Sequence, residues 1–318
     1  MNKTALITGV AGQDGSYLAE FLLSKKYEVY GIDFNFQEKT NSNIAKIKEK
    51  IHIYECDVTD KEKVSQVIEE ILPDEIYHLA GIANPLVSPE TESAVLYGNI
   101  NGLYNILSAA RKFSPKAHIF FAGSSLIFGK PAVSPQDENT PINPNTPYGI
   151  AKAAGYFLVK LYRESYGIFV CTGILYNHES LRRNPEFLPK KITQTAAKIK
   201  KGLVKELRLG DLRAIRDWGY AGDYVEAMWL MLQAKTSDDY VVGTGKGHTV
   251  ENILEIAFGE LGLNWRNYVI IDPSLVRTLE QIPLIANPRK IGDVLGWKAK
   301  TEFKDLIVSM VRNDLINL

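Results

Sequence analysis

The sequence predicts an α/β protein built on a doubly wound parallel sheet, with a smaller α/β lobe attached to it. Short apolar strands alternate with helical segments through the first half of the 318 residues, a pattern typical of a parallel sheet covered on both faces. The strand at residues 4–8 runs directly into Gly9, Gly12 and Gly15 and then into a helix at residues 16–25. Glycines at such a turn let a pyrophosphate approach the helix N-terminus. We therefore expect a Rossmann-type sheet that binds a dinucleotide.

The expected cofactor is NAD, because the second strand, residues 27–32, ends at Asp33. A carboxylate at this place accepts hydrogen bonds from the adenosine ribose hydroxyls and would repel a 2′-phosphate. Residues after the third strand (51–54) and at the end of the fourth (74–79) are also expected beside the dinucleotide. The predicted cofactor-binding residues are Gly9, Gly12, Gln13, Asp14, Gly15, Asp33, Asp57, Val58, Leu79, Ala80, Tyr148 and Lys152.

The candidate catalytic residues are Ser124, which follows the fifth strand (118–122), and the pair Tyr148 and Lys152. Four residues apart on a helix, Tyr148 and Lys152 share one face. An ammonium beside the phenol favours phenolate and is expected to pull its pKa down from about 10. A phenolate can take a proton from a sugar hydroxyl, and Ser124 can hydrogen-bond the same oxygen. The structural alternative is an accidental spacing on an exposed helix face. For His78 we expect a satisfied strand-end histidine without catalytic role.

Composition excludes several function classes. The 37 basic and 37 acidic side chains balance, so nothing favours a nucleic acid or an anionic membrane as partner. Cys56 and Cys171 lie in apolar runs, which predicts buried free thiols in a reducing compartment. No apolar segment is long enough to span a bilayer, and no signal-peptide pattern begins the chain. These observations predict a soluble, cytoplasmic protein without a metal site.

The second half continues the alternation and gathers basic side chains. A basic lobe facing the cofactor lobe fits a diphosphate substrate, although most of the lysines can equally be ordinary solvated charges. The predicted elements are a helix from Tyr148 to about 166, a strand at 169–175, a helix at 190–201, a short strand at 207–210, a turn at 216–220 into a helix from Asp223, a strand at 240–243 and a helix at 249–262.

Six motifs resemble the extended short-chain dehydrogenase/reductases and, among them, the GDP-mannose 4,6-dehydratase family. The resemblance covers nearly the whole chain, and the last motifs are not general to the superfamily. The motifs are T-G-V-A-G-Q-D-G-S-Y-L-A-E from residue 8, P-D-E-I-Y-H-L-A from 73, T-P-Y-G-I-A-K from 146, G-I-L-Y-N-H-E-S-L-R-R from 173, L-G-D-L-x-A-x-R-D-W-G from 209, and N-P-R-K from 287 ahead of L-G-W.

The resemblance implies roles for particular residues. Ser124, Tyr148 and Lys152 would carry the hydride chemistry, and a GDP-sugar would be the substrate. Residues 1–175, with about 215–245, would form the NAD-binding Rossmann domain, and about 176–214 with 246–318 the sugar-nucleotide-binding lobe. The predicted substrate-binding residues are Ser88, Ser125, Leu126, Asn177, Lys191, Leu209, Arg216, Arg277 and Glu280.

Two departures from the family pattern matter. The dehydratases carry a glutamate two residues after the serine or threonine of the active-site strand, where this chain has Leu126. They also use NADP with an arginine after the second strand, where this chain has Asp33-Phe34-Asn35. Loss of water across carbons 5 and 6 needs a base and an acid, and leucine is neither. Losing a placed acid/base typically costs ~10²–10⁴-fold in rate. The sequence therefore predicts an NAD(H)-dependent oxidoreductase acting at carbon 4 of a GDP-linked, manno-configured hexose or heptose.

Other readings stay open from the residues alone. A dehydratase with a substitute acid such as Glu179, a 4-epimerase and a 4-keto reductase would use the same three catalytic residues, and an NAD-sensing protein could keep the fold alone. The helices at 96–113 and 148–166 are apolar around more than one core-facing stripe. They predict a homodimer or homotetramer through these helices.

Overall fold

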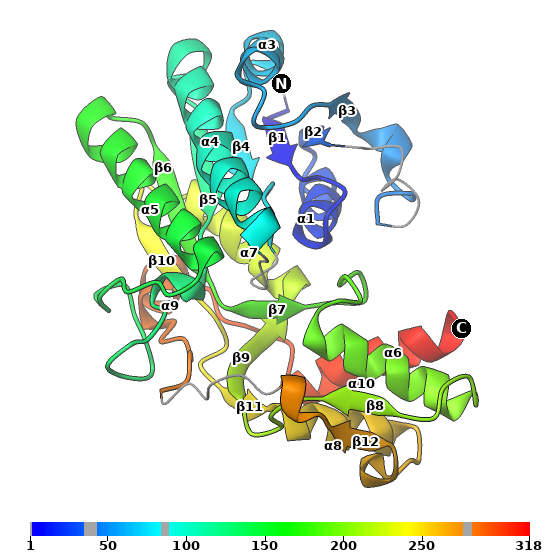
Figure 1. Cartoon of the computed structure of the whole chain (residues 1–318). Helices are drawn as coiled ribbons and strands as arrows, with labels where there is room; N and C mark the ends of the chain where they lie inside the picture. The colour runs from blue at the N-terminus through cyan, green and yellow to red at the C-terminus, as the bar shows by residue number, and fades with distance from the viewer. Residues whose placement is uncertain (1, 35–42, 84–88, 276–281) are drawn as a thin grey trace.

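A computed structural model describes residues 2–34, 43–83, 89–275 and 282–318. Its centre is a seven-stranded sheet in the order β10-β6-β5-β4-β1-β2-β3, and every neighbouring pair is parallel. The doubly wound parallel sheet predicted from the sequence is confirmed (Figure 1). Its strands are β1 (Thr4–Thr8), β2 (Glu28–Asp33), β3 (His52–Glu55), β4 (Glu75–His78), β5 (His118–Ala122), β6 (Val170–Leu175) and β10 (Asp239–Val242).

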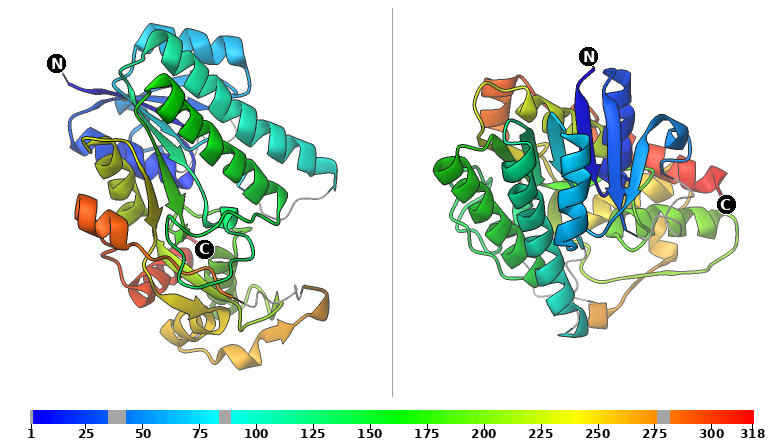
Figure 2. Two further views of the ribbon diagram at one scale, coloured as in Figure 1. Left: turned by 90° about the vertical axis from the view of Figure 1, so that its left-hand side faces the viewer. Right: turned by 90° about the horizontal axis from the view of Figure 1, so that it is seen from above.

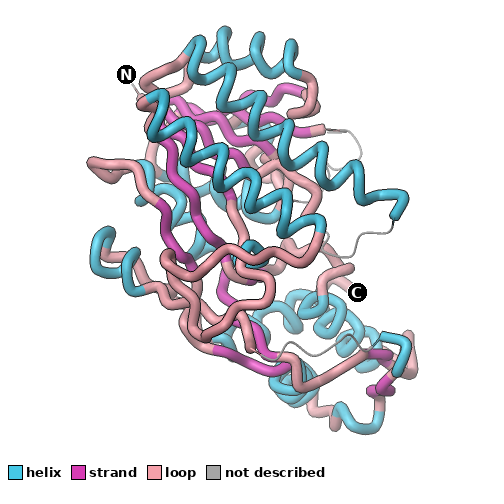
Figure 3. The backbone as a smooth tube through the Cα atoms, turned by 60° about the vertical axis from the view of Figure 1, so that its left-hand side comes forward, coloured by secondary structure: helices cyan, strands magenta, loops and turns pink. Residues whose placement is uncertain are grey.

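Helices cover both faces of this sheet, which is why its strands are continuous apolar runs. On β1, Ala5 and Ile7 enter the core on one face, whereas Leu6 enters the core on the other, as the two-residue period of a strand requires. Figure 3 shows helices lying across the strands. One face packs against α1 (Gln13–Ser24), α7 (Ala221–Leu232) and α9 (Arg289–Leu295), the other against α3 (Lys61–Ile71), α4 (Pro89–Phe113) and α5 (Pro147–Tyr166).

A smaller unit lies beyond the carboxyl ends of the strands, below the sheet in Figure 1 and in the left view of Figure 2. It has its own apolar core, in which Ile192, Phe258 and Met310 meet from three helices. Its three-stranded sheet has the order β11-β9-β7, and β12 pairs with β8. The elements are β7 (Asn177–Glu179), α6 (Leu188–Lys200), β8 (Leu207–Leu209), β9 (Ile215–Tyr220), β11 (Gly247–Thr249), α8 (Val250–Glu260), β12 (Val269–Ile271) and α10 (Phe303–Ile316).

The structure corrects several sequence-based expectations. The predicted turn at 216–220 is the strand β9, whose backbone pairs with both β7 and β11. Helix α4 begins at Pro89 rather than at residue 96, because proline suits the first turn of a helix. Helix α10 had no sequence prediction. The strand β9, which the sequence places in the NAD-binding domain, pairs within the smaller unit. The helix α9, which the sequence places in the other lobe, packs against β10 of the large sheet.

Two simpler expectations can also be compared with the structure. Cys56 and Cys171 are buried free thiols, as predicted, and burial raises their pKa values to about 11 and about 12. Such thiols are inert at neutral pH. Within the described ranges, none of the helices has the length and apolar character needed to cross a membrane.

Candidate active site

The end of β5 and the start of α5 bring together Ser124, Tyr148 and Lys152. Ser124 caps a short 3₁₀ turn, residues 125–127, and its Oγ accepts a hydrogen bond from the Leu126 backbone N–H at 3.2 Å. Helix α5 begins at Pro147 after Thr146, whose side chain accepts from a first-turn N–H group. The buried Lys152 Nζ donates to the carbonyl oxygen of Ala122 at 2.9 Å. This hydrogen bond fixes the helix against the strand end.

The electrostatics of this triad differ from the sequence-based expectation. Burial raises the pKa of Tyr148 to about 12, while the positive charge of Arg183 and a hydrogen bond with Ser124 partly oppose the rise. Burial lowers the pKa of Lys152 to about 8. The Lys152 Nζ lies 5.6 Å from the centre of the Tyr148 ring and is held by the Ala122 carbonyl. The expected lowering of the Tyr148 pKa by Lys152 is therefore wrong for this structure; the opposing charge comes from Arg183.

A cavity of about 530 Å³ opens at the carboxyl ends of β1 and β4, where the strand order of a doubly wound sheet reverses and ligands bind. Steric crowding explains why glycine stands at positions 9 and 15 beside this cavity. Gly9 has φ +73°, and a Cβ there would lie 3.1 Å from the Ala80 backbone. A Cβ on Gly15 would lie 2.2 Å from the Gly9 carbonyl oxygen. The lining includes the predicted Gly9, Gly12, Asp33, Asp57, Val58, Leu79 and Ala80, and also Asn184.

The predicted ribose acceptor, Asp33, faces this cavity and is only 6% exposed. Its Oδ2 accepts from the Ala11 N–H and its Oδ1 from the Phe34 N–H, both at 2.9 Å. These bonds fix the carboxylate beside the glycine turn, and a carboxylate oxygen can accept more than one hydrogen bond. The close-approach glycines, the start of α1 and this carboxylate together fit a dinucleotide whose ribose is unphosphorylated.

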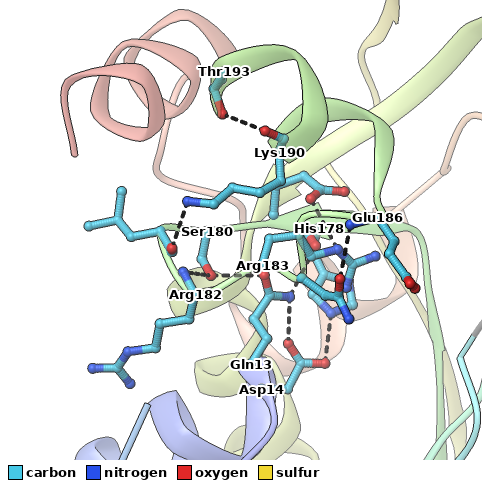
Figure 4. A network of polar contacts seen from close by, with 12 residues as sticks. Gln13, Asp14, His178, Ser180, Arg182, Arg183, Glu186, Lys190 and Thr193 are labelled. Carbon is cyan, nitrogen blue, oxygen red and sulfur yellow. Dashed lines mark hydrogen bonds and ion pairs between the residues drawn. The ribbon is translucent and has the colours of Figure 1, made fainter. Parts of the chain in front are cut away.

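A polar network joins the start of α1 to the segment after β7 (Figure 4). Gln13 Nε2 donates to the His178 carbonyl at 3.2 Å, and its Oε1 accepts from Ser180 Oγ at 2.8 Å. Asp14 Oδ2 lies 2.8 Å from His178 Nε2. Burial disfavours both charges, but their mutual attraction prevails, so the pKa of Asp14 is lowered and that of His178 is raised. Gln13 and Asp14, predicted to bind cofactor, thus use their side chains to hold this segment.

Sequence reasoning missed several polar residues around the site, among them His178, Arg183 and, on α4, Asn99. Arg183 Nε lies 3.1 Å from Glu179 Oε2, and Glu179 is almost fully buried. Burial raises the pKa of the Glu179 carboxyl. The Arg183 guanidinium also stacks on the Phe187 ring, 3.5 Å from its centre. The only sequence signal for His178 and Arg183 was their position after a predicted strand, in the motif N-H-E-S-L-R-R.

The third of these residues is Asn99 on α4. Its Nδ2 donates to the carbonyl oxygens of Val95 and Ile82 at 2.9 and 3.3 Å, whereas its buried Oδ1 has no partner in the described structure. A Cβ added to Gly81 would lie 2.4 Å from this Oδ1 and 3.7 Å from Lys152 Nζ. Glycine at position 81 therefore leaves space between an unsatisfied acceptor and the active-site lysine, and a buried acceptor of this kind calls for a donor.

The predicted substrate-binding residues fall into separate places. Lys191 Nζ donates to the Arg208 carbonyl at 3.2 Å, which puts Lys191 beside the buried Leu209. Arg216 lies on β9. Ser125 is buried and Leu126 partly buried in the 3₁₀ turn, and Asn177 begins β7. The predicted residues Ser88, Arg277 and Glu280 lie outside the described residues.

His78 is placed as a structural residue and not as a catalytic one. His78 is buried, 2.9 Å from Thr8 Oγ1, and burial with the nearby Lys152 charge lowers its pKa to about 3. It is a neutral, satisfied histidine at the end of β4, as expected. In the part of the chain that the structure describes, no group of histidine, cysteine and acidic side chains is arranged to hold a metal ion.

The parallel sheet, the glycine turn at its switch point and the Ser-Tyr-Lys arrangement define an enzyme of the extended short-chain dehydrogenase/reductase class. Among solved structures, the UDP-glucose 4-epimerase of Thermotoga maritima has a TM-score of 0.86 at 23% identity, over 98% of both chains. The Thermus thermophilus UDP-glucose 4-epimerase complex with NAD has a TM-score of 0.83 at 27% identity, again over 98% of both chains.

The sequence comparisons narrow the class to one family. Residues 6–310 match the family described as GDP-mannose 4,6 dehydratase. GDP-mannose 4,6 dehydratase 2 of Arabidopsis thaliana is 45% identical over 327 aligned positions, covering 98% of this chain and 87% of the relative. GDP-mannose 4,6-dehydratase of Vibrio cholerae is 36% identical, covering 99% and 94%. The chain belongs to the GDP-mannose 4,6-dehydratase family.

Proposed function

We propose that this protein is an NAD(H)-dependent oxidoreductase acting at carbon 4 of a GDP-linked, manno-configured sugar, GDP-mannose or GDP-manno-heptose, in nucleotide-sugar metabolism. The GDP-mannose part of the proposal rests on the names of its relatives. The choice of NAD rests on Asp33 at the cavity, and it agrees with the NAD complex of the Thermus relative. The unit built on the seven-stranded sheet would bind NAD, and the smaller unit, to which β9 belongs, would bind the sugar nucleotide.

The chain's own residues would then act on the carbon-4 hydroxyl. NAD, when bound, supplies the acceptor for the hydrogen that leaves carbon 4 with its electron pair. The phenolate form of Tyr148, which its raised pKa makes the minor form in the free protein, takes the hydroxyl proton, and the Ser124 hydroxyl donates a hydrogen bond to the same substrate oxygen. Arg183 supports the phenolate, because its charge opposes the rise in the Tyr148 pKa. Lys152 holds α5 against the end of β5 through Ala122.

The observation that carries the proposal is Leu126. Its backbone N–H donates to Ser124 Oγ, and its carbonyl oxygen would lie 2.6 Å from a Cβ on Gly149, the neighbour of Tyr148. Position 126 is thus fixed beside two catalytic residues. A leucine there neither removes the carbon-5 proton nor protonates a leaving hydroxyl, so oxidation is favoured over elimination of water.

The second candidate is dehydration with a substitute acid, which the names of the relatives favour. Glu179 is the available carboxyl near the site, and its raised pKa suits a proton donor. Its ion pair with Arg183 at 3.1 Å holds it in place. In this reading Glu179→Gln would remove water elimination while Tyr148 and Lys152 still oxidise carbon 4.

Product analysis separates the two candidates. The purified protein is incubated with NAD and either GDP-mannose or GDP-manno-heptose, and the products are followed by mass spectrometry in deuterated water. We expect loss of two hydrogens from one of these substrates, with formation of NADH, an intact carbon-6 hydroxyl and no deuterium at carbon 6. A 4-keto-6-deoxy product from the unmodified protein would overturn the proposal. No NADH and no product from either sugar would also count against it.

A further inference from the structure

One residue of the smaller unit reaches the dinucleotide cavity. Among the described residues that line the cavity, only Asn184 follows Gly98 in the chain; it lies in the loop between β7 and α6. The rest of the lining comes from the glycine turn, from residues at and just after the carboxyl ends of β2, β3 and β4, from Asn43, and from Gly98 on α4. Asn184 is exposed, so its amide is available to a ligand in the cavity.

Arg182, two residues before Asn184, anchors this loop to the first turns of α1. Its Nη2 lies 2.6 Å from Glu20 Oε1 and its Nη1 donates to Ser16 Oγ at 3.1 Å. The guanidinium also lies 4.2 Å from the centre of the Tyr17 ring. Figure 4 shows Arg182 and Ser180 above the start of α1, with Gln13 and Asp14. Asn184 is therefore held near the helix end where a dinucleotide diphosphate binds.

The orientation of the Asn184 amide follows from its hydrogen bond. The Oδ1 accepts from the Glu186 backbone N–H at 2.9 Å, and a backbone N–H accepts no hydrogen bond, so the oxygen must be the atom that faces it. The Nδ2 is then left as the donor. A neutral N–H donor beside a diphosphate forms a charge-assisted hydrogen bond, one of the stronger kinds in proteins.

We propose that Asn184 is a cofactor-binding residue, and that its Nδ2 donates to the diphosphate of bound NAD across the cavity from the glycine turn. This inference rests on the proposed NAD binding and deepens it. The smaller unit then contributes directly to the cofactor site, in addition to binding the sugar nucleotide.

The sharpest variant is Asn184→Asp, which has the same shape and keeps the acceptor for the Glu186 N–H, but replaces the donor by a negative oxygen. Asn184→Ala removes the donor without adding charge. Asn264→Asp is the matched control, because Asn264 Oδ1 accepts from the Arg266 N–H in the same local geometry and is not part of the cavity lining. The purified proteins are titrated with NADH, followed by its fluorescence, after their nucleotide content has been measured.

We expect Asn184→Asp to weaken NADH binding at least ~10-fold, Asn184→Ala to weaken it less than that but measurably, and Asn264→Asp to stay within about twofold of the unmodified protein. Equal affinity of Asn184→Ala and the unmodified protein would overturn the inference, even if Asn184→Asp binds poorly, because added charge alone would then explain that loss. Failure of the unmodified protein to bind NADH would instead overturn the proposed cofactor.

Discussion

The buried ion pair between Lys190 on α6 and Asp314 on α10 yields a quantitative prediction about stability. Lys190 Nζ lies 2.5 Å from Asp314 Oδ1, and the two side chains are only 5% and 4% exposed. Lys190 also donates to the Leu181 carbonyl at 3.0 Å, and Thr193 Oγ1 donates to Asp314 Oδ2 at 2.7 Å. The pair therefore joins two helices to the loop that carries Asn184.

The perturbation is Asp314→Asn, which keeps the side-chain shape and removes the charge. The Lys190 ammonium then stays buried without a counter-ion, a situation that typically costs about 3–5 kcal/mol. The hydrogen bonds to Leu181 and from Thr193 can persist, so we expect a loss of about 3 kcal/mol in the free energy of unfolding. Urea unfolding followed by circular dichroism measures this as a lower midpoint with an unchanged slope.

Arg312→Ala on the same helix is the matched control. Arg312 Nε lies 2.7 Å from Glu260 Oε1, but its side chain is 65% exposed, and such surface pairs contribute about 0–1 kcal/mol. The double variant Lys190→Met with Asp314→Leu should regain most of the stability, because no unpaired charge remains. If Asp314→Asn costs no more than Arg312→Ala, the reasoning from burial is wrong.

Three further predictions follow from the site and the surface. NAD(H) should bind at least ~10-fold tighter than NADP(H), a difference of about 1.4 kcal/mol in binding free energy. Asp33→Ala should make the two affinities more alike. Equal affinities of the unmodified protein for the two cofactors in calorimetry would contradict the role given to Asp33. Tyr148→Phe should abolish NADH formation, because the proton acceptor is lost, while NADH binding in a fluorescence titration persists. Undiminished turnover would exclude Tyr148 as the proton acceptor. Exposed apolar side chains on α4 and α5, among them Tyr97 and Phe157, lead us to expect at least a dimer, and a monomeric mass by light scattering at micromolar concentration would rule it out.

The ion pair between Asp14 and His178 should make the stability of the fold depend on pH. Asp14 raises the pKa of His178 above 6.5. While Asp14 is ionised, the contribution of protonated His178 to stability is therefore fully present below about pH 6.5 and is lost as the pH rises through the raised pKa. Asp14→Asn should reverse the sign of this dependence, because burial and the Arg183 charge then lower the pKa of His178. Denaturant unfolding at several pH values between about 5 and 8 tests it; an identical pH dependence in both proteins would show that the pair does not titrate as described.

The fold was predictable because its signals are local. The strand β1, which ends at Thr8, and the helix that follows Gly12 are neighbours in sequence. The burial of β1 on both faces follows from its continuous apolar run. The strand β9 was missed because pairing with β7 and β11, and not its own composition, decides its structure. The roles of His178 and Arg182 were missed for the same reason: their partners on α1 lie more than 160 positions away in the chain.

Tyr148, the predicted catalytic tyrosine, shows most clearly what sequence spacing alone does not determine. The four-residue spacing correctly places Tyr148 and Lys152 on one helix face, but it does not say where the lysine Nζ points. The Ala122 carbonyl holds that Nζ, and burial raises the Tyr148 pKa to about 12. The charge that opposes this rise belongs to Arg183, in the loop that Arg182 anchors to α1. The charge that opposes the rise in the Tyr148 pKa therefore comes from the smaller unit, and a substitution that frees this loop is expected to raise that pKa further.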